Sequence, residues 1–184
     1  DYDTALSMVE AAKKAGVDAV KFQTFIPELL VSPYADSLIK YGKDDAKDYK
    51  TIEFFNSLLL NKKELSQLKK KAEESGLVFF SSPFDLPSVE LLEELGVPIY
   101  KIASSEITNL KLIETIALTG KPAIISTGIS KEHEIEKAIE IFKMNSNAEI
   151  ALLHCVSLYP LPPQSANLKR IKSLKEKFGL ITGF

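Results

Sequence analysis

The sequence contains a single cysteine, Cys155, and no long uninterrupted run of apolar residues. One cysteine excludes a disulfide within the chain and fits a reducing compartment, so we expect a cytoplasmic protein. A membrane-spanning helix needs about 20 consecutive apolar residues, so we expect no membrane partner. The formal net charge of −2 argues against nucleic acid as a partner. Any binding site for an anion must therefore be local.

Glycines end most of the helical patterns, and an apolar strand follows each of them. These glycines are Gly16, Gly76, Gly96, Gly120 and Gly179. A glycine directly after a helix is the usual left-handed cap. A sixth strand, residues 150–155, follows Asn145 to Asn147, which we expect to cap the preceding helix in the same way.

Polar N-capping residues precede most of the helical patterns. Asn61 followed by Glu64 has the spacing of a capping box. The other expected caps are Asp85, Asn109 and Ser130. With a first helix from Thr4 to Ala15 and a last one near Asn167, six helices alternate with six strands. This alternation predicts a parallel sheet.

Polar residues end nearly every expected strand, in the stretches 21–24, 81–82, 101–106, 126–127 and 154–157. An open doubly wound sheet would gather such residues at one crevice, usually beside a glycine-rich phosphate loop, which this sequence lacks. A barrel distributes them over the carboxyl ends of many strands. We therefore predict an α/β fold, a (β/α)₈ TIM barrel. Because the chain opens on a helix and stops on an apolar run, residues 1–184 are expected to form a single partial barrel lacking its first and last strands.

The connection at residues 26–61 is far longer than the others. It contains Tyr34, Tyr41, Tyr49 and the pair Phe54–Phe55, and is too apolar for a disordered segment. Connections of this length are uncommon unless they have a functional role. We expect a lid over the barrel mouth or a subunit contact, containing short helices.

Two lysines interrupt apolar strands near their carboxyl ends. Lys21 and Gln23 are two residues apart, so both point to one side of their strand, and Val20 and Phe22 suit the opposite, helix-covered side. Lys101 repeats this arrangement in PIYKIASSE. Buried lysines are rare without a partner, which favours two inward ammonium groups that bind an anion. The alternative is that each lysine extends from the strand end into water.

Hydroxyl and carboxylate groups follow the same strands. Glu106 is either a structural partner of Lys101 or a group that contacts substrate. Ser82, Ser104 and Ser157 are either helix caps or donors to a phosphate. Tyr159, in the proline-rich stretch SLYPLPP, either offers a rigid hydroxyl or packs its loop.

The two histidines and the cysteine do not form a convincing metal site. His154 and Cys155 are adjacent, so on a regular strand their side chains face opposite sides. We expect Cys155 to behave as a small buried hydrophobe. His154 is expected to be a hydrogen-bonded interior histidine, and His133 to lie on the surface.

Six ordered stretches, VKFQTF, FFSSPFD, YKIASSEI, ISTGIS, LLHCVSLYPLPP and GLITGF, cover almost the whole chain. They resemble the catalytic barrel of the sialic acid synthase (N-acetylneuraminate synthase) family, which includes pseudaminic and legionaminic acid synthases. The resemblance implies condensation of phosphoenolpyruvate with an N-acetylated hexosamine, foremost N-acetylmannosamine. The product would be a nine-carbon 2-keto sugar acid such as N-acetylneuraminate, with release of phosphate. A modified 2,4-diacetamido hexose is the alternative sugar.

The resemblance also implies roles for individual residues. Lys21, Lys101 and Glu106 would be catalytic. Phosphoenolpyruvate would be bound by Lys21, Ser82, Lys101, Ser104, Ser157 and Tyr159, and the sugar by Gln23, Glu106 and Tyr159. Ser82 and Ser157 stand where threonine and asparagine are familiar in sialic acid synthases, which leaves the choice of sugar open.

Other implications concern groups outside this segment. A divalent metal, Mn²⁺ or Mg²⁺, would be held by histidines beyond Phe184, so no metal ligand is expected within residues 1–184. A small antifreeze-like domain would follow, and the full-length protein would be a homodimer. We expect the segment alone to be inactive.

Two other functions compete with the synthase. One is an aldolase that forms a Schiff base through Lys101. The other is a barrel without catalytic activity, whose lysines pair with carboxylates.

Overall fold

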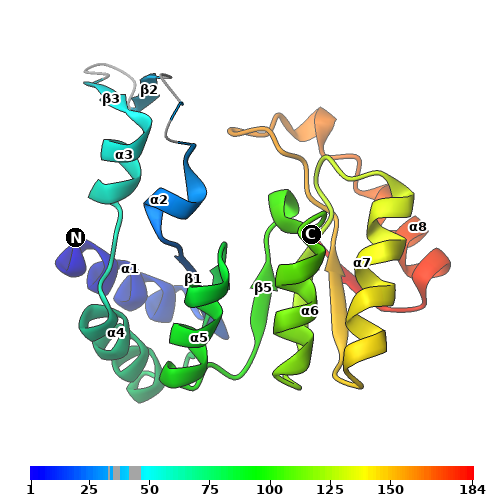
Figure 1. Cartoon of the computed structure of the whole chain (residues 1–184), viewed down its shortest axis with the longest axis horizontal. Helices are drawn as coiled ribbons and strands as arrows, with labels where there is room; N and C mark the ends of the chain where they lie inside the picture. The colour runs from blue at the N-terminus through cyan, green and yellow to red at the C-terminus, as the bar shows by residue number, and fades with distance from the viewer. Residues whose placement is uncertain (33, 35–37, 42–46) are drawn as a thin grey trace. The chain divides into compact units, whose positions relative to one another are not determined.

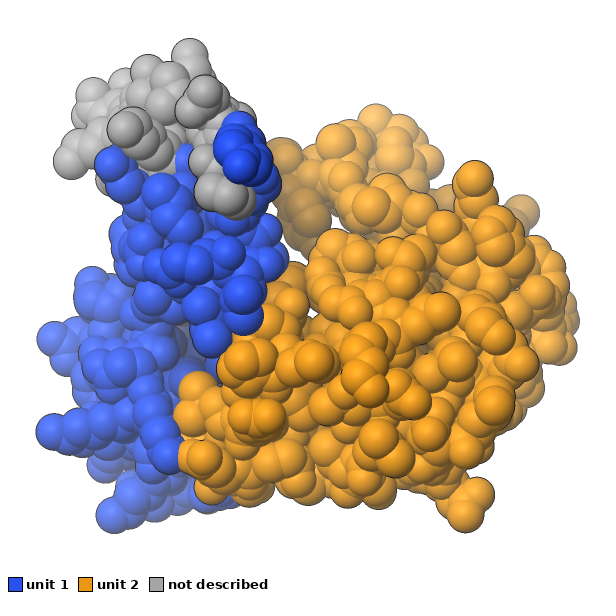
Figure 2. All heavy atoms as spheres, in the orientation of Figure 1, with its two compact units in different colours: residues 1–79 blue, residues 80–184 orange. Residues whose placement is uncertain are grey.

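The computed structural model describes residues 1–32, 34, 38–41 and 47–184. It divides into two compact units, Asp1–Phe79 and Phe80–Phe184 (Figure 2). Across the described residues no helix is both long and apolar enough to cross a bilayer.

Unit 1 contains the first helices and the beginning of the sheet (Figure 1). Its elements are α1 (Tyr2–Ala15), β1 (Ala19–Thr24), α2 (Pro27–Leu30), β2 (Leu38–Tyr41), β3 (Lys47–Lys50), α3 (Thr51–Ser57) and α4 (Lys62–Glu74). Helices α1 and α4 pack against each other. The predicted capping box starts α4: Asn61 Oδ1 accepts a hydrogen bond from Glu64 N, and Asn61 N donates to Glu64 Oε2.

The 26–61 segment follows β1 and contains the two short helices α2 and α3, as predicted. It also contains an unpredicted antiparallel pair, β2 and β3, with Leu38 opposite Lys50 and Tyr41 opposite Lys47. The rings of Phe25 and Phe55 pack edge to face, which joins α3 to the end of β1. Residues 33, 35–37 and 42–46 lie outside the described residues. A lid or subunit contact here stays a prediction.

Unit 2 contains most of the sheet and the helices that cover it. Its elements are β4 (Val78–Pro83, which starts in unit 1), α5 (Leu86–Leu95), β5 (Tyr100–Ile102), η1 (Ser104–Glu106), α6 (Leu110–Leu118), β6 (Ala123–Ser126), α7 (Glu132–Asn145), β7 (Ile150–Leu153), η2 (Pro163–Ser165), α8 (Lys169–Phe178) and β8 (Ile181–Gly183). Helices α6 and α7 lie side by side (Figure 1).

The strand order is β1-β4-β5-β6-β7-β8, which follows the order along the chain. The pairs from β4 to β8 are parallel. A doubly wound sheet reverses its strand order at a switch point, and this order has no reversal. The predicted α/β class and parallel sheet are therefore confirmed, whereas closure into a barrel stays a prediction.

Two predicted helix caps around α7 are wrong. The helix ends at Ser146, which is extended rather than left-handed; its Oγ instead accepts a hydrogen bond from Ala148 N. At the other end the N-cap is Lys131, one residue after Ser130. The reason is that Lys131 N donates to Glu134 Oε2, while the Ser130 hydroxyl donates to Gly128 O. The caps at Asp85 and Asn109 and the left-handed glycines are as predicted.

The sheet of unit 2 has one fully buried face and one partly open face. In register across β5, β6 and β7, the buried face carries Tyr100, Ala123 and Ile150 and then Ile102, Ile125 and Leu152, none more than 4% exposed. The alternate positions start with Lys101, Ile124, Ala151 and Ile181, of which Ile181 is 67% exposed. Lys101 thus lies on the face away from the helix-covered core.

Candidate functional site

Of the two lysines with a predicted function, Lys101 is the more buried, with 9% of its surface exposed. Its Nζ donates to Ser126 Oγ at 2.5 Å and to the backbone oxygen of Ile102 at 2.8 Å. Ser126 lies on the same face because Lys101 pairs with Ile124, two residues before it. The ammonium is therefore held by oxygen atoms at the carboxyl ends of β5 and β6.

Ser126 also joins Lys101 to the end of β7. Cys155 Sγ donates to Ser126 Oγ at 3.2 Å, so this hydroxyl accepts from both neighbours. Cys155 is half-buried. The prediction that it acts as a small hydrophobe therefore misses a polar contact.

Ser104 and Ser157 converge on the backbone of Gly128, just after β6. Gly128 N donates to Ser104 Oγ at 2.9 Å. A Cβ built on Gly128 would lie 2.7 Å from Ser157 Oγ and 2.9 Å from Ser104 Oγ. The structure thus brings together two of the predicted phosphate donors, at the same sheet edge as the Lys101–Ser126 pair.

The remaining predicted residues of unit 2 have distinct environments. Ser82 is 2% exposed and follows Ser81, which pairs with Tyr100, so its register position is that of Lys101. Glu106 accepts hydrogen bonds from Ser105 Oγ at 3.2 Å and Asn109 Nδ2 at 3.0 Å. Tyr159 is 91% exposed, so the alternative that it packs its loop is wrong.

Lys21 and Gln23 belong to unit 1, where the predicted alternation of β1 is confirmed. Both are exposed, whereas Val20 and Phe22 are half-buried and Phe22 stacks on Phe79 at 5.0 Å. Although Lys21 is exposed as a whole, partial desolvation of its ammonium lowers its pKa below the usual value of 10.5. Among the described residues no hydrogen-bond or ion-pair partner of its ammonium is found. Lys21 and Gln23 line a cavity of about 470 Å³ within unit 1, together with residues of α1 and of 58–60.

Ser126 and Gly128 belong to the site but are not among the predicted site residues. In the sequence Ser126 is part of a polar strand end, and Gly128 lies within the stretch ISTGIS. Both act through contacts with residues 24 or more positions away in the sequence. The sequence signal for Ser126 is its place at the end of an apolar strand, whereas its pairing with Lys101 depends on the register of β5 on β6.

The residues that the structure describes do not supply a metal site. His154 is 4% exposed; its Nε2 is hydrogen-bonded to Ala166 O at 2.8 Å, and its Nδ1 is buried without a partner among the described residues. Cys155 contacts a different element, Ser126. No cluster of three histidine, cysteine or acidic side chains forms in the described part of the chain. The described residues therefore offer no donor set for the divalent metal, which stays a prediction.

The cluster of unit 2 is suited to binding a small anion. The carboxyl ends of β5, β6 and β7 carry the Lys101 ammonium and the hydroxyls of Ser104, Ser126 and Ser157, which supply positive charge and hydrogen-bond donors. Charge-assisted hydrogen bonds of this kind are stronger than neutral ones. In parallel α/β folds this end of the sheet is where ligands bind.

Comparison with known proteins gives consistent relatives. Residues 8–184 match the model of the NeuB family. The chain is 41% identical to a pseudaminic acid synthase and 39% identical to an N,N'-diacetyllegionaminic acid synthase, both from Campylobacter jejuni. These matches cover 98% and 100% of this chain, and 53% and 56% of the relatives. The chain therefore spans about half the length of the curated relatives it matches.

A solved structure supports the same assignment. The chain matches the crystal structure of an N-acetylneuraminic acid synthetase from Leptospira borgpetersenii with a TM-score of 0.88 and 34% identity. The match covers 100% of this chain and 59% of that one. The family match, the identities and the shared fold agree, and the chain belongs to the NeuB family.

Proposed function

We propose that this chain is the phosphoenolpyruvate-binding part of a synthase that makes a nine-carbon 2-keto sugar acid. The observation that carries the proposal is the buried Lys101 ammonium, which donates to the Ser126 hydroxyl at the carboxyl ends of β5 and β6. The hydroxyls of Ser104 and Ser157 meet at Gly128, just after the same end of β6. The family membership supports the reaction class, because the matched relatives are named as sugar acid synthases.

The chemistry of the substrate fits this group of residues. Phosphoenolpyruvate carries close to three negative charges, and these need more than one cation together with several donors. Lys101 and Lys21 are the proposed cations. Ser82, Ser104, Ser157 and Tyr159 are the proposed donors. Gln23, Glu106 and Tyr159 are proposed to contact the amino sugar.

The proposed reaction forms one carbon–carbon bond and releases phosphate. C3 of phosphoenolpyruvate attacks the aldehyde carbon of the open-chain sugar, and water adds at C2. Breakage of the C2–O bond then gives the 2-keto acid and inorganic phosphate. Lys101 is proposed to stabilise the negative charge of the bound substrate throughout, and Glu106 to exchange a proton with the sugar. No step is assigned to a metal, for which the described residues offer no donor set.

A product assay on the full-length protein tests the proposal. The enzyme is incubated with phosphoenolpyruvate, Mn²⁺ and separate sugars, and the products are identified by mass. The panel holds N-acetylmannosamine and a 2,4-diacetamido hexose, the second because of the pseudaminic and legionaminic acid synthases among the relatives. We expect one sugar to yield a 2-keto acid with one phosphate released per product.

Borohydride trapping and a binding measurement distinguish the synthase from the two alternative functions. Borohydride added with a keto acid would trap Lys101 covalently if the protein were a Schiff-base aldolase; we expect no adduct. Absence of product with every sugar, together with no binding of phosphoenolpyruvate, would support a barrel without catalytic activity and overturn the proposal.

A further inference from the structure

Gly128 is a glycine for reasons of space. Its φ lies outside the left-handed range, unlike Gly16, Gly76, Gly96, Gly120 and Gly179, so its backbone conformation is open to other residues. A Cβ at this position would nevertheless lie 2.7 Å from Ser157 Oγ, 2.9 Å from Ser104 Oγ and 3.3 Å from Cys155 Cβ. Two hydroxyl groups occupy the volume that a side chain would take.

Hydrogen bonds fix the turn that carries Gly128 on both sides. Before it, Thr127 donates twice to Leu153 O, from N at 2.9 Å and from Oγ1 at 3.0 Å. At Gly128 itself, N donates to Ser104 Oγ, and O accepts from the Ser130 hydroxyl at 3.0 Å. The backbone of residues 127–130 is thus held by contacts with β7 and η1 and by the Ser130 hydroxyl at the end of the turn.

The next residue in this turn is strained. Ile129 has a φ of 51°, which a β-branched residue rarely adopts. Its side chain is 80% exposed, so burial does not compensate for this conformation. Backbone strain of this kind persists where surrounding contacts enforce it, and it is frequent at functional sites.

We propose that the turn Thr127–Ser130 positions the anion-binding hydroxyls and that Gly128 is its positioning residue. The Gly128 amide occupies an acceptor position on Ser104 Oγ, so the Ser104 hydroxyl proton points away from Gly128 and is available to a ligand. The missing side chain lets the Ser157 hydroxyl approach the same point. This inference rests on the proposed function, and the ligand is the phosphate group of phosphoenolpyruvate.

The substitution Gly128→Ala tests the inference. The nearest obstacles to the new methyl group are two serine hydroxyls, which can rotate about χ1. We expect the protein to fold with a melting temperature only slightly lowered, because the hydrogen bond from Gly128 N to Ser104 Oγ is weakened. The rotated hydroxyls no longer converge, and two charge-assisted hydrogen bonds are weakened. We therefore expect the Kd for phosphoenolpyruvate to rise about tenfold or more. Inorganic phosphate is the second probe, and its affinity should fall in parallel.

Gly120→Ala is the matched control. Gly120 has a φ of +72° and open space around a built Cβ. Alanine there introduces backbone strain without touching the site, so we expect a lower melting temperature with an unchanged Kd. Gly128→Ala should thus change mainly the Kd, and Gly120→Ala only the melting temperature.

A double variant, Gly128→Ala with Ser104→Ala, tests whether Gly128 acts through the Ser104 hydroxyl. If Gly128 acts through Ser104, the Gly128→Ala change should cost less affinity in a Ser104→Ala background than in the wild type. The KM for phosphoenolpyruvate should rise in Gly128→Ala, while the KM for the sugar stays within twofold.

The outcomes distinguish the inference from the proposed function. A wild-type protein that binds neither phosphoenolpyruvate nor inorganic phosphate would overturn both. A wild type that binds, with a Gly128→Ala variant of equal affinity, would overturn the positioning role alone. A Gly128→Ala chain that does not fold would also contradict it, because only side-chain ends should have to move.

Discussion

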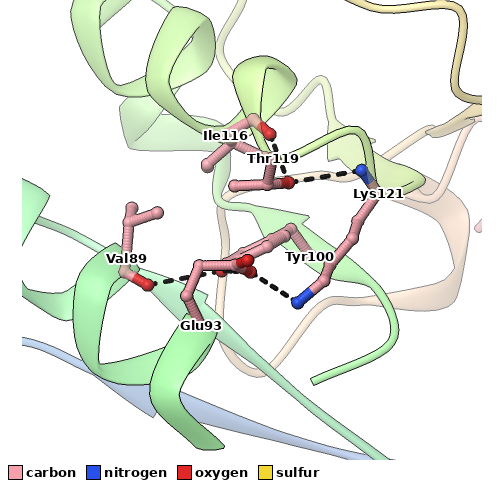
Figure 3. A network of polar contacts seen from close by, with 6 residues as sticks. All are labelled: Val89, Glu93, Tyr100, Ile116, Thr119 and Lys121. Atoms are coloured by element: carbon pink, nitrogen blue, oxygen red, sulfur yellow. Dashed lines mark hydrogen bonds and ion pairs between the residues drawn. The ribbon is translucent and has the colours of Figure 1, made fainter. Parts of the chain in front are cut away.

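The hydroxyl of Tyr100 lies at the centre of a polar network between α5 and the start of β6 (Figure 3). Tyr100 is fully buried; its hydroxyl donates to Glu93 Oε1 at 2.6 Å and lies 3.3 Å from Val89 O. The same carboxylate oxygen accepts from Lys121 Nζ at 2.6 Å. The substitution Tyr100→Phe removes the hydroxyl and leaves the Glu93–Lys121 pair.

The size of the effect follows from these contacts. A hydrogen bond to a charged group contributes about 1.5–3 kcal/mol to stability. The lower half of that range applies here, because the Glu93 side chain is 38% exposed and keeps Lys121 as a partner. We expect Tyr100→Phe to lower the free energy of unfolding of unit 2 by about 1.5–2 kcal/mol. Lys121→Met, which removes only a partly exposed ion pair, should lower it by less than about 1 kcal/mol.

The pH dependence gives the prediction a second readout. Burial, the hydrogen bond to Glu93 and the negative charge of Glu93 raise the pKa of Tyr100 above its usual value of 10.0. The folded state therefore favours the neutral phenol. Its contribution is complete below pH 10 and is lost as the pH rises above 10, where the unfolded state releases the proton first. The wild type should lose this share of stability in alkali, and Tyr100→Phe should not.

Hydrogen exchange across α5 and β5 in increasing urea is the appropriate assay for the full-length protein, because it reports the opening of this region alone. Destabilisation by Tyr100→Phe below 0.5 kcal/mol, or an unchanged loss of stability above pH 10 in that variant, would refute the reasoning.

Three further predictions concern the site and its turn. Because partial desolvation lowers the pKa of Lys21, the affinity for phosphoenolpyruvate should fall as the pH rises, beginning below 10.5. Lys21→Arg stays charged and should remove that part of the loss. The same pH dependence of affinity in both proteins would contradict this prediction. Ser126→Ala removes an acceptor from Lys101 and should raise the Kd for phosphoenolpyruvate about tenfold. Cys155→Ala, its matched control, removes the other donor to Ser126 and should change the Kd less than twofold; equal effects would argue against the Lys101 contact. Ile129→Asn should raise the free energy of unfolding by about 1 kcal/mol, since asparagine tolerates a positive φ; destabilisation in a thermal melt would show that Ile129 is not strained.

Features encoded by neighbouring residues were predictable from the sequence. The capping box of Asn61 and the cap at Asp85 depend on residues three positions apart, and both are present. The same holds for the alternation of Lys21 and Gln23 against Phe22 in β1. Such signals need no knowledge of the tertiary structure.

Features that depend on competing local contacts were less predictable. Ser130 was a plausible cap for α7, yet its hydroxyl donates to Gly128 O, and the helix begins after Lys131. Ser146 bonds to Ala148 N, so the end of α7 is extended. In each case the serine hydroxyl bonds to a nearby backbone group, and the sequence does not show which of several such bonds forms.

Long-range contacts of the site were beyond sequence reasoning. The Lys101–Ser126 bond requires the register of β5 on β6, and the role of Gly128 requires η1 and the end of β7 to meet beside it. In the sequence, nothing distinguishes Gly128 from any other glycine that follows a strand. The β2–β3 pair in the 26–61 segment likewise had no strong period in the sequence.

Calorimetric titration of phosphoenolpyruvate into the full-length protein shows whether the buried Lys101 ammonium binds this substrate. Lys101→Met keeps the length of the side chain and removes the buried ammonium, whereas Lys111→Met removes an exposed one and serves as the control. We expect binding by the wild type and the Lys111→Met variant, and a loss of affinity of about a hundredfold in Lys101→Met. Equal affinity of Lys101→Met and the wild type would contradict it.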